Sequence, residues 1–117
     1  MRALRVEDGT LHRLPGRDWW ALVGPDEGGE ERFILGVAEF PAGSDPGPHV
    51  HEGGTEVIYI LAGEGEIRSE GEVHRLERGV AIHIEEGREH RIVNTGDTPL
   101  RMITLLAPPV VPGSYDR

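Results

Sequence analysis

The sequence of 117 residues contains no cysteine and no lysine. Without cysteine the chain has no disulfide bonds, no thiolate nucleophile and no sulfur-ligated zinc site. Without lysine it cannot form a Schiff base with a substrate. All twelve basic residues are therefore arginine, and nucleophilic catalysis is disfavoured.

Positive charge and long apolar runs are also scarce. The 21 acidic residues outnumber the 12 basic ones and give a net charge of −9, whereas phosphate binding requires a basic patch. No apolar stretch is long enough to span a bilayer, and the N-terminus lacks the apolar core of a signal peptide. We expect a cytoplasmic protein that binds neither nucleic acid nor membranes.

The length indicates one domain over residues 1–117. A domain this small leaves much of its surface exposed, so pairing with a second copy would bury more of it. We therefore expect a homodimer.

The local pattern is typical of an all-β protein. Seventeen glycines and nine prolines are spread along the chain, and short apolar runs recur between them without a helical period. We expect a polar surface loop over 26–31 and an extended segment over 108–117. The predicted strands cover residues 3–6, 19–23, 32–40, 56–61, 66–68, 73–76, 80–84, 90–94 and 100–106. This spacing suits a sandwich or a barrel.

Three histidines and one carboxylate form the candidate site. His49 and His51 are one residue apart, so on an extended chain both side chains point the same way. Glu56 begins one predicted strand and His90 begins another. A closed barrel could turn all four groups inward, where burial without a metal would cost roughly several kcal/mol. A divalent cation would remove that cost.

The spacing of these residues resembles the first motif of the cupin superfamily. Its five fixed positions are Gly43, His49, His51, Glu56 and Gly63.

Residues 79–94 resemble the second cupin motif, with His90 as its histidine and Asn94 at its end. The sequence departs from that motif at Glu85, where the family usually has proline, and at Val80, where aspartate is frequent. Neither position is a ligand in the family.

The resemblance covers residues from about 32 to 108 and implies a double-stranded β-helix, the jelly-roll barrel of cupins. It also implies one divalent transition metal, held by His49, His51, Glu56 and His90. Family members carry Fe, Mn, Zn, Ni or Cu, and the set of three imidazoles and one carboxylate does not choose among these ions.

Other residues are candidates for the pocket around the metal. Ile58, Ile60 and Ile92 should line an apolar interior. Arg88, just before His90, could orient an anionic substrate group, although an exposed loop position is the usual one for arginine. His83 faces away from its isoleucine neighbours, so it could serve as a general base in the pocket, contact a partner subunit or be structural.

The adjacent Trp19 and Trp20 should point to opposite faces of a strand, which favours a dimer contact for one of them.

These features favour a metal-dependent enzyme acting on a small molecule, of the dioxygenase or the isomerase/epimerase type. The alternative is a non-catalytic module that binds or senses a small molecule. A structural protein without a metal is the third and weakest interpretation.

Overall fold

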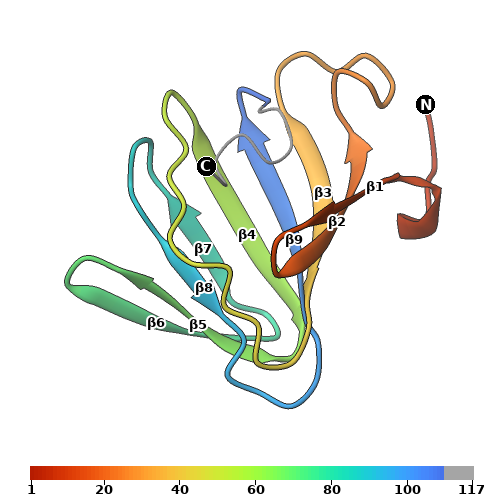
Figure 1. The fold of residues 1–117 in the computed structure, drawn as a ribbon. Helices are drawn as coiled ribbons and strands as arrows, with labels where there is room; N and C mark the ends of the chain where they lie inside the picture. Colours follow the sequence, from red (N-terminus) through yellow and green to blue (C-terminus); the bar gives the residue numbers. More distant parts are fainter. Residues whose placement is uncertain (110–117) are drawn as a thin grey trace.

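The computed structural model describes residues 1–109 and is nearly all β, as the sequence predicts (Figure 1). A short 3-10 helix, η1 (Val6–Asp8), precedes the strands. The strands of the described residues are β1 (Thr10–Leu14), β2 (Arg17–Val23), β3 (Ile34–Phe40), β4 (Thr55–Ala62), β5 (Glu64–Ser69), β6 (Glu72–Glu77), β7 (Ala81–Ile84), β8 (Arg91–Val93) and β9 (Leu100–Ala107). From residue 110 on, the segment expected over 108–117 lies outside this range.

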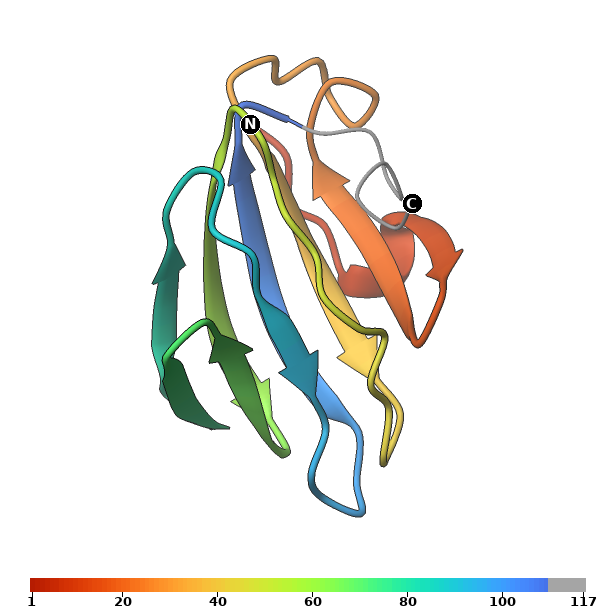
Figure 2. The same cartoon turned by 60° about the vertical axis from the view of Figure 1, so that its left-hand side comes forward.

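The strands form two antiparallel sheets that face each other (Figures 1 and 2). The larger sheet has the order β1-β2-β3-β9-β4-β7, and the smaller one has the order β6-β5-β8. Two facing sheets of this kind fit the jelly-roll fold.

Closure of the two sheets into a barrel is not shown within residues 1–109, where the sheets share no strand. A cavity of about 420 Å³ lies between β7 and β6, the free edges of the two sheets, and is lined from both sides.

The core lies between the sheets and follows the alternation of side chains along the strands. On β9, Leu100, Met102, Thr104 and Leu106 are buried, and the residues between them are more exposed. Burying each large aliphatic side chain contributes about 1.5–3 kcal/mol.

The N-terminal strand predicted at residues 3–6 is wrong. The chain turns there through η1, because the Asp8 carboxylate accepts a hydrogen bond from the backbone N–H of Arg5 at 3.0 Å. The first strand is instead β1, which pairs with β2 across the turn at Gly16. As an edge strand with mostly exposed side chains, β1 lacks the apolar pattern that would have predicted it.

Gly63, the last position of the first motif, is required where β4 turns into β5. Its φ of +86° is favourable only for glycine, and a Cβ there would overlap the backbone of Pro99 and Leu100. Among residues 1–109, no helix is long and apolar enough to cross a membrane.

Candidate metal centre

The histidines reach the site because the segment before β4 runs alongside β8 (Figure 2). The backbones of His49 and His90 exchange two hydrogen bonds, of 2.7 and 2.9 Å. Two residues further on, the carbonyl of His51 accepts a hydrogen bond from the N–H of Gly87 at 3.1 Å. Both histidines of the first motif are therefore held beside the histidine of the second.

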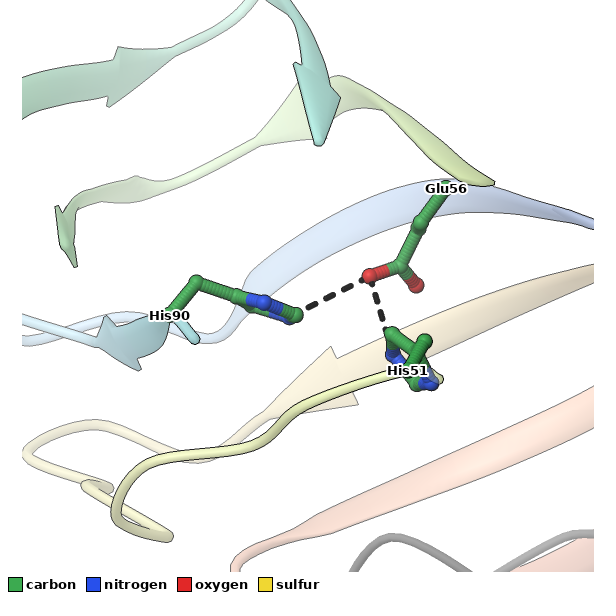
Figure 3. Close-up of side chains that lie close together, drawn as sticks. All are labelled: His51, Glu56 and His90. Atoms are coloured by element: carbon green, nitrogen blue, oxygen red, sulfur yellow. Dashed lines mark ion pairs between the residues drawn. The ribbon is translucent and has the colours of Figure 1, made fainter. Parts of the chain in front are cut away.

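Glu56 comes from the opposite sheet, on β4, and meets two of these rings (Figure 3). The Nε2 atoms of His51 and His90 each lie 3.3 Å from Oε1 of Glu56. One ligand atom from each of the three residues lies within 4.8 Å of the others. The site thus joins the two sheets through a single carboxylate oxygen.

His49 lies beside this cluster. It is 7 % exposed, and its ring centroid is 6.1 Å from that of His90. All four predicted ligands line the same cavity. The structure therefore brings the four residues together, with His51, Glu56 and His90 closest to one another.

Electrostatics keep the carboxylate of Glu56 ionised although it is buried. Burial is the strongest single effect and opposes ionisation, but hydrogen bonds and charges from His51 and His90 outweigh it, and the pKa of Glu56 falls to about 2. Burial likewise opposes the charged form of His90, yet the hydrogen bond and charge of Glu56 raise the pKa of His90. The buried carboxylate of Glu56 therefore stays ionised.

The second ring nitrogen of His90 has its own partner. Its Nδ1 lies 3.1 Å from the carbonyl oxygen of Arg88. A carbonyl only accepts hydrogen bonds, so Nδ1 carries a proton. Nε2 then donates to Glu56 when the ring is charged, and it offers its lone pair to a metal ion when the ring is neutral. Metal-binding histidines in proteins are oriented in this way.

The donor atoms suit a divalent ion. Both imidazole–carboxylate pairs are 3.3 Å apart, a separation that two ligands could have if each bound the same ion at about 2.1 Å. Imidazole and carboxylate together suit several transition metals. His51, Glu56 and His90 could therefore hold a metal ion, with His49 available as a fourth ligand.

The cavity around these residues is small, with a volume of about 30 Å³. Besides the four predicted ligands, the lining residues are Arg17, Trp19, Ala38, Phe40, Ile58, Ile92, Met102, Thr104 and Leu106.

Two polar residues of this lining were not predicted from the sequence. Arg17 is only 5 % exposed, and its Nη1 donates a 2.7 Å hydrogen bond to the carbonyl of Pro15. Thr104 accepts a 2.9 Å hydrogen bond from the indole Nε1 of Trp19. The alternation of β2 was the available signal for Arg17, because Arg17 and Trp19 are two residues apart and share the inner face.

The other predicted residues lie in different places. Ile58 and Ile92 line the cavity, whereas Ile60 is fully buried in the core beyond it. His83 is exposed on the outer face of the larger sheet, where its Nε2 lies 2.9 Å from Oγ1 of Thr55. Arg88 borders the cavity between β6 and β7. The roles suggested for His83 and Arg88 stay predictions. Neither residue lines the small cavity of the four ligands, but both line the larger cavity between β6 and β7, which His90 also borders.

The two tryptophans separate as expected. Trp19 is buried and lines the cavity, and Trp20 lies on the outer face of the larger sheet.

Comparison with known proteins gives consistent results. The chain is 33% identical over 88 residues to the tetracenomycin polyketide synthase protein TcmJ of Streptomyces glaucescens, and the match covers 75% of this chain. It is 37% identical over 68 residues, 58% of this chain, to an oxalate-binding protein of Thermotoga maritima. The matched regions span only 59% and 56% of these two relatives.

A solved structure described as a predicted oxalate decarboxylase from Thermotoga maritima superposes with a TM-score of 0.80 at 26% identity. The match covers 91% of this chain and 98% of that one. The model of the cupin domain family matches residues 36–106, which include both motifs and all four predicted ligands. The chain therefore belongs to the cupin family.

Proposed function

We propose that the protein is a metal-dependent enzyme acting on a small molecule. One divalent transition metal (Fe, Mn, Zn, Ni or Cu) is held by His49, His51, Glu56 and His90. The observation that carries this proposal is the convergence of two imidazole nitrogens on one buried carboxylate oxygen, each at 3.3 Å. When bound, such a metal polarises oxygen atoms of a substrate and, in an iron form, activates O2, which suits dioxygenase or isomerase/epimerase chemistry.

Arg17 supports a small acid as the substrate. A divalent ion outweighs the negative charge of Glu56, so the loaded site attracts anions, and Arg17 lines the same cavity. Guanidinium groups bind carboxylates with two parallel hydrogen bonds. The relative that is named an oxalate-binding protein agrees with this class of ligand.

The size of the cavity favours the same class. The space of about 30 Å³ beside the ligands suits one small group of a substrate, and the remainder of a larger molecule would have to lie outside it. We therefore favour a short carboxylic acid over a polyketide, although one relative is named a polyketide synthase protein.

One observation favours a second candidate function, a non-catalytic binding module. Apart from the four ligands, the polar side chains of the lining are Arg17, Thr104 and Trp19, and the Thr104 hydroxyl already accepts a hydrogen bond from Trp19. None of the three serves readily as a general base near neutral pH. A cavity of this kind suits tight binding without turnover.

A binding and turnover assay separates the two candidates. The protein is loaded with Fe²⁺ or Mn²⁺ and tested with oxalate, short keto acids, diketones and catechols for O2 uptake, product formation and calorimetric binding. Turnover supports the enzyme, and binding without turnover supports the module. If the metal-loaded protein neither binds nor converts any of these compounds, the proposed function is wrong.

The role of Arg17 has a matched control. Arg17→Gln should weaken carboxylate binding by about tenfold or more, the cost of a lost charged hydrogen bond, and leave the metal content unchanged. Arg13→Gln removes the same charge from an exposed position on β1 and should have no effect. Equal binding by the two variants would exclude Arg17 from ligand recognition.

We also propose that the protein is a homodimer, paired through the outer face of the larger sheet. Trp20, Ile103 and Tyr59 lie in one cross-strand row with the buried Val37, across β2, β3, β9 and β4, and Tyr59 is 44 % exposed. Tyr59→Glu should convert the dimer to a monomer in analytical ultracentrifugation. Val73→Glu, at an apolar site on β6 that is 61 % exposed, serves as the control and should leave the dimer intact.

A further inference from the structure

Arg88 lies in a loop, yet its guanidinium donates hydrogen bonds to three other side chains. Its Nε donates to Oγ of Ser69 at 2.7 Å, and its Nη2 donates to Oε1 of Glu72 at 2.8 Å. Its Nη1 donates to Oε1 of Glu85 at 3.1 Å. The guanidinium thus joins the β5–β6 hairpin to the loop between β7 and β8.

Glu85 is the residue at which the second motif departs from the family pattern. Here it accepts two hydrogen bonds from Arg88. Its carboxylate accepts one from the side chain of Arg88, and its carbonyl accepts one from the Arg88 backbone N–H at 3.1 Å. The unusual residue is therefore a partner of Arg88 in this chain.

The hydroxyl of Ser69 makes two hydrogen bonds to the loop between β7 and β8. Its hydroxyl accepts from Nε of Arg88 and donates to the carbonyl of Glu89 at 2.6 Å. Two successive residues of the loop, Arg88 and Glu89, are therefore fixed to the end of β5, immediately before His90.

The backbone of Arg88 contacts the metal site directly. Its carbonyl oxygen lies 3.1 Å from Nδ1 of His90, the atom that sets the tautomer and the orientation of that ring. We propose that Arg88 is a positioning residue for the metal ligand His90. Its side chain, clamped by Ser69, Glu72 and Glu85, holds its own carbonyl in place. This inference rests on the proposed metal-binding function.

The clamp depends on the shape of a guanidinium. Three nitrogens of one planar group donate to three different side chains, whereas the ammonium of a lysine is a single point of charge on a flexible stem. Arg88→Lys should therefore restore only part of what Arg88→Gln loses.

The test measures Co²⁺ binding to the full chain by competition with a chromophoric chelator, together with the visible spectrum of the bound ion. Arg88→Gln should weaken Co²⁺ binding about tenfold, the low end for loss of an outer-sphere contact, and should alter the spectrum because the ligand ring is less well held. Glu85→Gln should act in the same direction with a smaller effect. Arg75→Gln is the matched control. Arg75 lines the cavity between β6 and β7, as Arg88 does, but within residues 1–109 its ion pairs are with Glu64 and Glu77.

A second measurement does not need the metal. In metal-free protein, hydrogen–deuterium exchange over residues 85–91 should be faster in Arg88→Gln than in wild type and unchanged in Arg75→Gln. If wild type fails to bind Co²⁺, the proposed function is wrong, and the exchange rates still test the clamp.

Either of two results would overturn the inference: unchanged exchange in Arg88→Gln, or Co²⁺ binding that Arg75→Gln weakens as much as Arg88→Gln. If Arg88→Gln does not fold, Ser69→Ala and Glu85→Gln remove single contacts of the clamp and should show the same changes on a smaller scale. If neither of these two variants changes Co²⁺ binding or hydrogen–deuterium exchange, the proposed positioning role of Arg88 is also wrong.

Discussion

The hydrogen bond between Trp19 and Thr104 offers a quantitative test of how the wall of the cavity is built. The indole Nε1 lies 2.9 Å from Oγ1 of Thr104, and the two residues are 6 % and 7 % exposed. Thr104→Val keeps the shape of the side chain and removes the acceptor. The indole N–H would then be buried without its partner, at a cost of about 1–3 kcal/mol.

For a domain of this size, about 2 kcal/mol corresponds to a fall in the melting temperature of roughly 8 °C. The assay is urea unfolding of metal-free protein, followed by circular dichroism, for wild type, Thr104→Val, Trp19→Phe and the double variant. In the Trp19→Phe background the N–H is already gone, so Thr104→Val should cost little there. A coupling energy of at least about 1 kcal/mol is expected. A Thr104→Val variant within about 0.5 kcal/mol of wild type would refute the reasoning.

Three further predictions concern the frame around the site. Gly36→Ala should destabilise the protein by about 1–3 kcal/mol in the same urea assay, because the new Cβ would overlap the indole of Trp19; an unchanged midpoint would contradict this. Asn94→Ala should cost at least about 2 kcal/mol, since the Asn94 amide donates to three backbone carbonyls at 2.9–3.1 Å; a smaller loss would show that water replaces it. The hydrogen bond from Arg91 lowers the pKa of Asp45, although burial opposes this. Asp45 therefore stabilises the fold above its unfolded pKa of about 3.9, and this contribution is lost as the pH falls through its lower folded value. The stability difference between wild type and Asp45→Asn should shrink on acidification below about pH 4, and a constant difference would contradict the assignment.

The sequence predicted the parts of the site that depend on strand alternation and motif spacing. His49 and His51, one residue apart, are both buried, and the residue between them is more exposed. Glu56 and Ile58 share the inner face of β4, as their spacing requires. Eight of the nine predicted strands correspond to strands of the structure, with shifts of a few residues at their ends.

The remaining features depend on contacts between distant segments, which alternation cannot predict. Arg17 is an exception, because alternation places it on the same face as Trp19. It was missed because the predicted strand began only at residue 19 and a buried arginine is rare. The partners of Arg88 come from β5, β6 and the β7–β8 loop, so no local pattern indicates them. The side to which His83 points could be settled only by the pairing of β7 with β4, which places it on the outer face opposite Val57.

The most direct test of the metal site is the metal content of protein isolated without chelator, measured by elemental analysis. Wild type should contain about one divalent transition metal per chain, and His49→Ala/His51→Ala should lose it. His74→Ala/His83→Ala removes two exposed histidines and should retain the metal of wild type. Wild type without metal, and with an unchanged melting temperature when metal is added, would contradict the site. So would equal metal contents in wild type and His49→Ala/His51→Ala.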